Sequence, residues 1–407
     1  MISFEKAKSI VDENIIILDT EEVELIESGN RVLAEDIVAT FDMPRFNNSS
    51  MDGFAVRAID TKGASRTKPV TLKLVGGVAA GESGDLKIGY RECARCMTGA
   101  PIPGGADSIV IVEDTSGFDN ENEVKIFVES TSGKNIRLKG EEISKGDKLI
   151  IKNKMISPSE IGIMASFGYG RVLSYRIPKI AVFATGDELI EPGDILKNGK
   201  IYNSNLYVFS ELVRQRGFNI TMSEVISDSP DSLKSFLSDA VDKCDIIISS
   251  GGVSMGKHDY VRDVFMEIGV EEHFWKVTQK PGKPLFFGTK SGKMIFGLPG
   301  NPVSSFLGFM VWIWPVFDRL MGLENDQWMT AKLASSFPRE PFKTRFLFGR
   351  LLIQERKLIC LPSNKLGSHM LSSALNANCI IKANPGDTEL KEGQNILVKL
   401  LPWKKIA

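Results

Sequence analysis

The stretch CDIIISSGGVSMGKHDY (Cys244 to Tyr260) joins an almost continuous apolar run to a loop of glycine, small hydroxyl and acidic residues. An apolar run of this length is typical of a strand that is buried on both faces. A loop of this composition supplies backbone amides and a carboxylate, which are groups that bind phosphate and its counter-cation. The stretch therefore predicts a buried strand whose carboxyl end carries a ligand site.

The same succession of strand and loop recurs on both sides of that stretch. KIAVFA (Lys179 to Ala184), NITMSEVI (Asn219 to Ile226) and PLFFG (Pro284 to Gly288) are strand candidates. Helical patterns follow the first two at about 204–216 and 227–243. Strands that alternate with helices predict a doubly wound, mostly parallel α/β sheet, in which ligands bind outside the carboxyl ends of the strands.

Acidic residues occur in the loops that this fold would bring to one edge of the sheet. One isolated acid at such a position would more simply cap a helix, but acids on successive loops favour a shared site. Mg²⁺ would let these carboxylates bind beside a phosphate, because it takes oxygen ligands from both. The loop residues predicted to meet there are Asp187, Glu188, Asp228, Gly251, Gly252, Ser254, Gly256 and Asp259.

Two further motifs predict anion binding. KPGKP (Lys280 to Pro284) places two lysines three residues apart around a glycine turn. Solvated surface charge is the usual fate of lysine, but the flanking prolines argue against a plain surface turn here. In GLPGNPVSS (Gly297 to Ser305), Asn301 is suited to the N-cap and Pro302 to the first helical position. The helix is therefore expected to begin with exposed amides at Val303, Ser304 and Ser305.

The first half of the chain contributes two dense polar loops. FNNSSMDGFAV (Phe46 to Val56) holds Asp52 before a glycine, and MTGAPIPGGADSIV (Met97 to Val110) holds Thr98. Thr98 could serve only as a turn residue. Rigid loops that present one acid or hydroxyl are nevertheless candidates for function.

Composition gives bounds on the class of protein. Fifty basic and 51 acidic residues give a formal charge of −1, so nucleic acid and anionic membranes are not expected partners. Five cysteines suit a reducing cytoplasm, and the charged start of the chain does not resemble a signal peptide. FLGFMVWIWPVF (Phe306 to Phe317) is too short for a spanning segment and predicts a buried helix.

Histidine and cysteine offer little additional chemistry. His258, His273 and His369 show no metal-ligand spacing. Cys93 and Cys96 form a CxxC pair, but there is no second pair, and the surrounding residues indicate a strand rather than the helix start of a redox motif. We expect no zinc or disulfide chemistry at that pair.

Changes of pattern along the 407 residues predict a multidomain fold of α/β plus β type. Strand-like runs separated by glycine turns indicate an inserted β domain in the first half, and strand-rich sequence returns after the α/β region as a β-barrel-like C-terminal domain. The predicted domains are 1–52 with 138–177 as a discontinuous N-terminal domain, 53–137, 178–323 and 324–407.

Nine motifs in order resemble the molybdopterin molybdenumtransferase family, which includes MoeA and the gephyrin E domain. The resemblance covers essentially the whole chain, and the set is highly specific although each motif alone is weak. The motifs are MDGFAV, MTGAPIPGGADSIV, NIRLKGEEISKGD, ATGDEL, IYNSN, SSGGVSMGKHDY, KPGKP, GLPGNPVSS and GSHMLSS.

The resemblance implies the last step of molybdenum cofactor synthesis. Adenylylated molybdopterin and molybdate would bind, molybdenum would pass to the dithiolene sulfurs, and the anhydride would be hydrolysed with release of AMP in the presence of Mg²⁺. It also implies the same four domains, with 1–52 and 138–177 serving dimerisation, and an elongated homodimer whose active site joins the α/β domain of one subunit to the N-terminal half of the other. The adenylyltransferase and other proteins of the pathway are candidate partners.

Site residues carry over at the matching positions only. The catalytic set is Asp52, Thr98, Glu188, Asp228 and Asp259, with Asp259 acting at the anhydride and Glu188, Asp228 and Asp259 as metal ligands. The substrate-binding set is Gly251, Gly252, Ser254, Arg137, Glu142, Asn301, Ser304 and Ser305, and the molybdate-side set is Lys280, Lys283, Pro284, Arg350 and Ser368.

The chain departs from the family pattern at a few positions, and two rival functions stay open. Glu142 stands where the family more often has Asp, Phe54 replaces a usual Tyr, and Lys257 with His258 precedes Asp259. The first rival is the adenylyltransferase that makes the adenylylated pterin, whose loop usually reads GGTG rather than GGVSMG. The second is a scaffold that anchors a partner, which the absence of a long linker disfavours.

Overall fold

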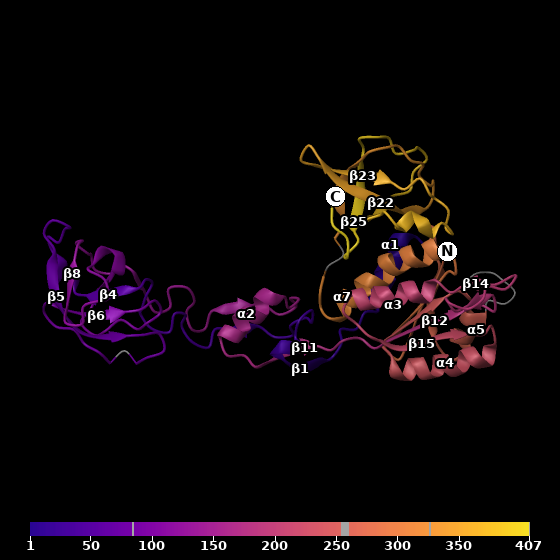
Figure 1. Cartoon of the computed structure of the whole chain (residues 1–407). Helices are drawn as coiled ribbons and strands as arrows, with labels where there is room; N and C mark the ends of the chain where they lie inside the picture. Colours follow the sequence, from indigo (N-terminus) through magenta and orange to yellow (C-terminus); the bar gives the residue numbers. More distant parts are fainter. Residues whose placement is uncertain (84, 254–259, 325–326, 407) are drawn as a thin grey trace. The chain divides into compact units, whose positions relative to one another are not determined.

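A computed structural model of the chain describes residues 1–83, 85–253, 260–324 and 327–406 (Figure 1). Internal contacts divide the chain into two compact units. The large unit comprises Met1–Ala34, Asn153–Ser157 and Arg171–Ala407, and the small unit comprises Glu35–Lys152 and Pro158–Gly170. Each unit has its own sheets and its own hydrophobic clusters.

The large unit is built on a six-stranded sheet. Across the sheet its strands are β15 (Ile220–Ile226), β12 (Ile180–Thr185), β16 (Ile246–Ser250), β20 (Lys293–Leu298), β19 (Pro284–Lys290) and β17 (Glu271–Lys276). The first four strands pair in parallel, whereas β19 runs antiparallel to both of its neighbours. β12 and β16 are buried along their whole length. The sheet is therefore mostly parallel, as predicted.

Helices pack on both faces of this sheet. Val182 of β12 belongs to a hydrophobic cluster that includes α3 (Asn205–Gln215). The next residue, Phe183, belongs to a second cluster with α4 (Pro230–Lys243) and α5 (Tyr260–Glu267). Successive residues of a strand point to opposite faces, so the two clusters lie on opposite sides of the sheet. This arrangement confirms the predicted doubly wound α/β fold.

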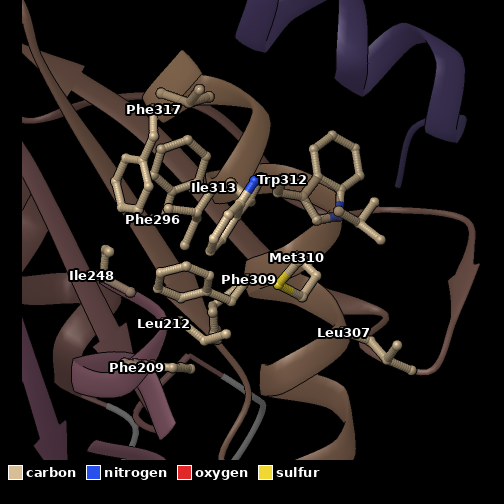
Figure 2. Close-up of a cluster of buried hydrophobic side chains, with 14 of the residues drawn as sticks. Phe209, Leu212, Ile248, Phe296, Leu307, Phe309, Met310, Trp312, Ile313 and Phe317 are labelled. Atoms are coloured by element: carbon tan, nitrogen blue, oxygen red, sulfur yellow. The ribbon is translucent and has the colours of Figure 1, made fainter. Parts of the chain in front are cut away.

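A long apolar helical stretch, Pro302–Leu320, packs in the cluster that contains α3 (Figure 2). It consists of α6 (Pro302–Gly308), a π-helical turn (Phe309–Ile313) and α7 (Trp314–Leu320). Its length and composition would suit a membrane span, but 89% of its apolar window is buried inside the protein. Figure 2 shows its aromatic side chains beside those of α3, β16 and β20. The expected buried helix is confirmed.

The start of the chain also packs into the large unit. α1 (Phe4–Glu13) contributes one buried face to the same cluster, and the ring of Phe4 lies 5.0 Å from that of Trp312. β1 (Thr20–Glu24) pairs antiparallel with β11 (Arg171–Tyr175). β1 precedes the small unit in the sequence and β11 follows it, so this strand pair joins the two chain segments that connect to the small unit.

A closed β-barrel forms the C-terminal part of the large unit. Its strands are β21 (Met329–Leu333), β22 (Thr344–Gln354), β23 (Lys357–Pro362), β24 (Cys379–Ala383) and β25 (Asn395–Leu400). The pairings run from β22 through β23, β21, β25 and β24 back to β22, which closes the ring. A short strand, β18 (Gln279–Lys280), pairs in parallel with β22. The predicted barrel-like C-terminal domain is confirmed, and β18 ties it to the KPGKP turn.

The small unit contains a five-stranded sheet, which confirms that the first half of the chain holds a β domain. Its order is β7 (Ser108–Ile111), β4 (Gly53–Val56), β6 (Glu92–Cys96), β5 (Val70–Val78) and β8 (Glu123–Ile126). The numerical boundaries of the four domains remain a prediction. This unit also contains the short strands β2 (Ile37–Val38), β3 (Asn48–Ser49), β9 (Ile136–Arg137) and β10 (Lys148–Ile150), and the helix α2 (Pro158–Ser166).

Candidate functional site

A cleft of about 1240 Å³ opens in the large unit at the carboxyl ends of three parallel strands, β12, β16 and β20. This is the edge at which ligands bind in doubly wound sheets. The barrel contributes residues to its rim as well. The cleft is lined by 184–189, 201–205, 228, 250–253, 279–284, 299–302, 304, 343, 345–347 and 366–369.

Carboxylates gather where β12 ends. The amide of Asp187 donates to Oδ2 of Asp228 at 3.4 Å, and the amide of Asp228 donates to Oδ1 of Asp187 at 3.3 Å. The Thr185 hydroxyl donates to Oδ1 of Asp228. Glu188 lines the cleft beside them, and a Cβ on Gly186 would lie only 2.7 Å from its carboxylate. Asp187, Glu188 and Asp228, predicted from two separate loops, therefore do meet at one edge.

The glycine loop after β16 packs so closely against its surroundings, including the end of β12, that there is no room for a side chain. Gly251 has φ +92° and Gly252 has φ +69°, values that L side chains rarely adopt. A Cβ on Gly251 would lie 2.8 Å from the Thr185 carbonyl oxygen, and one on Gly252 would lie 2.2 Å from Cγ2 of Val261. Only glycine fits at both positions. The predicted site residues Ser254 and Asp259, together with 256–258, lie outside the described residues.

Asn205, at the start of α3, joins two loops of the cleft. Its Nδ2 donates to Oγ of Ser250 at 2.8 Å and to the carbonyl oxygen of Gly300 at 2.7 Å. The ends of β16 and β20 are thereby tied together across the cleft. Asn205 was not among the predicted site residues, although it closes the IYNSN motif.

The KPGKP turn forms one wall of the cleft. Gly282 has φ +78°, and its carbonyl oxygen accepts from Nε2 of Gln279 at 2.8 Å. Lys280 extends to Glu340, with Nζ 2.7 Å from Oε1. Lys283 and Pro284 line the same wall. Both predicted lysines therefore belong to the cleft.

The start of α6 differs from the sequence expectation. Asn301 occupies the N-cap position, but its side chain makes no capping hydrogen bond. The amide of Val303 donates to the carbonyl oxygen of Ser368, and that of Ser305 donates to the carbonyl oxygen of Asn301, each at 3.0 Å. The prediction of three exposed amides is wrong for these two. Asn301 and Ser304 line the cleft, whereas Ser305 is buried behind it.

An arginine that was not predicted from the sequence pairs in register with Lys280, where β18 meets β22. Arg345 lines the cleft, is only 6% exposed, and donates through Nη1 to the carbonyl oxygen of Pro338 at 2.5 Å. Arg350, the predicted residue, lies five positions further along β22, is exposed and is not among the lining residues. Because side chains alternate along a strand, an odd separation places two residues on opposite faces. The predicted Ser368 does line the cleft.

The remaining predicted residues lie in the small unit. Oδ1 of Asp52 accepts from the amide of Thr98 at 2.7 Å and from its hydroxyl at 2.8 Å, and these bonds lower the pKa of Asp52. Asp52 is followed by Gly53, at which a Cβ would lie 2.1 Å from the Val110 carbonyl oxygen. Arg137 and Glu142 are both exposed. Asp52 and Thr98 therefore form one pair within this unit.

Among the described residues, no group of three or more His, Cys, Asp or Glu side chains is arranged to hold a metal ion. Cys93 and Cys96 are free, buried and assigned to different hydrophobic clusters, and burial raises the pKa of each thiol. His273 contacts Thr289, and His369 lies on the rim of the cleft.

Comparison with known sequence families accounts for most of the chain. Residues 2–168 match the MoeA N-terminal region (domain I and II), residues 181–319 match a probable molybdopterin binding domain, and residues 330–401 match the MoeA C-terminal region (domain IV). The three matches follow one another along the chain without overlap.

Curated relatives and solved structures agree with those matches. A molybdopterin molybdenumtransferase of Staphylococcus aureus (strain MRSA252) is 35% identical over 376 residues, which is 92% of this chain and 89% of that protein. The Staphylococcus epidermidis enzyme of the same name is 35% identical over 93% of this chain and 90% of its own length. Two crystal structures of the molybdopterin biosynthesis MoeA protein from Pyrococcus horikoshii superpose with TM-scores of 0.83 and 0.81. The first is 32% identical to this chain and the second 27%. Both alignments cover 98% of this chain, and they cover 99% and 100% of the two Pyrococcus chains, respectively.

Proposed function

Because this chain belongs to the molybdopterin molybdenumtransferase (MoeA) family of molybdenum cofactor biosynthesis, we propose that its cleft inserts molybdenum from molybdate into adenylylated molybdopterin and releases AMP. The observation that carries this proposal is that acids and bases from different elements line one cleft. Its acidic end is defined here by Asp187, Glu188 and Asp228 in the loops after β12 and β15, and its basic end by Lys280 of β18 and Arg345 of β22.

The acidic end suits a nucleotide anhydride together with Mg²⁺. Mg²⁺ in proteins is held by one or two carboxylates plus substrate phosphates, so the oxygens of Asp228 and Glu188 fit this ion without a larger protein cage. Bound there, Mg²⁺ would neutralise phosphate charge. The hydrogen bonds to Asp228 from Thr185 and Asp187 hold its carboxylate in one orientation. In the proposal Asp259 acts directly at the anhydride and also contributes to the metal set.

The basic end suits a tetrahedral oxyanion. Lys280, Lys283 and Arg345 supply positive charge, and the planar guanidinium can donate two parallel hydrogen bonds to a dianion. Ser304 and Ser368 also line the cleft, Ser304 beside Gly282 of the KPGKP turn and Ser368 beside Val303 at the start of α6. We therefore assign the molybdate-side role to Arg345, in preference to the exposed Arg350.

The small unit enters the proposal through a homodimer. The family resemblance implies that the N-terminal half of one subunit completes the active site of the other. Asp52, held by Thr98, would then supply a further acid to the partner's cleft, and Arg137 and Glu142 would contact substrate. The cytoplasm as location, and the adenylyltransferase of the pathway as a partner, belong to the same proposal.

Molybdate-dependent release of AMP tests this function. The purified protein is incubated with adenylylated molybdopterin, Mg²⁺ and molybdate, and AMP is quantified with and without molybdate. We expect release that requires both ions and that falls sharply in Asp259→Ala while ligand binding persists. Full turnover by that variant would contradict the role of Asp259. Formation of the adenylylated pterin from ATP and free pterin would instead identify an adenylyltransferase, and binding without any turnover would identify a scaffold.

A further inference from the structure

A carboxylate that does not itself line the cleft pairs with a lysine of its basic end, where an oxyanion is proposed to bind. Oε1 of Glu340 is 2.7 Å from Nζ of Lys280. The hydrogen bond from Lys280, together with the positive charges of Lys280, Arg345 and Lys343, lowers the pKa of Glu340. Lys280, Lys343 and Arg345 all line the cleft. Glu340 is thus an anion surrounded by the cations that a substrate oxyanion would use.

The backbone around Glu340 is fixed, but its contact with Lys280 is made by side chains alone. The amide of Gly386 donates to the carbonyl oxygen of Glu340 at 3.0 Å, and Nε of Arg339 donates to the carbonyl oxygen of Thr388 at 2.8 Å. The side chains of Glu340 and Lys280 are 21% and 48% exposed. Rotation of the Glu340 side chain toward solvent therefore requires no change in the loop.

We propose that Glu340 is a built-in competitor for the oxyanion subsite. An incoming dianion takes Lys280 from Glu340, and the carboxylate turns outward while its charge stays close to the subsite. In the empty subsite, Glu340 neutralises part of the positive charge. The affinity for an oxyanion is therefore lower than it would be if Glu340 were uncharged. This inference rests on the oxyanion role assigned to the basic end. The alternative is structural, with Glu340 holding Lys280 in its binding position.

The two possibilities predict opposite changes when only the charge of Glu340 is removed. A competitor that is lost leaves Lys280 free, so Glu340→Gln should tighten binding. A unit charge about 5 Å from a dianion in a water-like dielectric changes the dissociation constant by roughly tenfold. The gain should be smaller for a monoanion, because the Coulomb energy scales with the charge of the ligand. A positioning residue that is lost would instead weaken binding of both anions.

Calorimetric titration of the full-length protein at constant ionic strength provides the test. The probes are molybdate as the dianion and perchlorate as the monoanion. We expect Glu340→Gln to bind molybdate about tenfold more tightly and to show a smaller change for perchlorate. Unchanged or weaker molybdate binding by Glu340→Gln would overturn the inference. Circular dichroism of the variant establishes that it has folded.

Two further variants separate this inference from the proposed function. Glu267→Gln removes the same charge from another lysine–glutamate pair, with Lys234, and should leave molybdate binding within about twofold of the unmodified protein. Lys280→Gln should bind molybdate weakly. If Lys280→Gln binds as well as the unmodified protein, the oxyanion subsite itself is wrong. If Lys280→Gln loses binding while Glu340→Gln is unchanged, only the competitor role is wrong.

Discussion

Replacement of Gly252 by alanine should strongly reduce activity, because the added methyl group would displace the glycine loop and the carboxylates beside it. A Cβ at this position would lie 2.2 Å from Cγ2 of Val261 and 2.9 Å from Cγ2 of Thr185. The positive φ of +69° costs an alanine roughly 1 kcal/mol. Relief of the overlap requires a shift on the order of 1 Å and costs about 1–3 kcal/mol more. Thr185 also holds Asp228, so the acidic end would move with the loop.

A misplacement of this size should slow the proposed release of AMP by about 100-fold. Gly269→Ala is the matched control, because Gly269 has φ +82° and nothing lies within 4 Å of an added Cβ. It should show the backbone cost as a lower melting temperature while keeping near-normal turnover. Removal of the obstructing methyl groups in Gly252→Ala/Val261→Ala should recover about tenfold of the lost rate. Equal turnover of Gly252→Ala and Gly269→Ala would refute the steric argument.

Three further predictions concern other groups. Burial alone would raise the pKa of Asp245, but hydrogen bonds from Arg176 lower it to about 2. The resulting stabilisation, roughly 2 kcal/mol, is present above about pH 4 and is lost as the pH falls toward 2. In urea unfolding, Asp245→Asn should therefore be less stable than the unmodified protein at pH 7 and nearly equal to it at pH 2; a deficit that does not change with pH would contradict this. Asp52→Asn should reduce AMP release by roughly 100-fold with an unchanged melting temperature, and normal turnover would remove Asp52 from the catalytic set. Burial raises the pKa of Cys93 to about 12 and that of Cys96 to about 11, so iodoacetamide at pH 8 should label neither until the protein unfolds, as counted by mass spectrometry.

Much of the architecture could be predicted because it follows from local patterns. Apolar runs such as KIAVFA and CDIIISS indicated buried strands, and β12 and β16 are indeed buried throughout. Once the strands are parallel, their carboxyl ends share one edge, so acids in separate loops meet there. The meeting of Asp187 with Asp228 is a direct consequence.

The parts of the site that were missed depend on contacts between segments far apart in the chain. Arg345 reaches the cleft because β22 pairs with β18, and no local pattern distinguishes it from Arg350. The Val303 amide was expected to be exposed, but it donates to the carbonyl oxygen of Ser368. Ser368 lies between β23 and β24 of the barrel, far along the chain from α6. The role of Asn205 could not be predicted from local sequence, because its partners Ser250 and Gly300 lie 45 and 95 residues away along the chain.

Anomalous diffraction from crystals of the protein soaked with tungstate tests most directly whether the basic end of the cleft is an oxyanion site. Tungstate is a tetrahedral dianion like molybdate and has a strong anomalous signal. We expect a peak within hydrogen-bonding distance of Lys280, Lys283 and Arg345 and away from Asp228. A peak among the carboxylates, or outside the cleft, would contradict it.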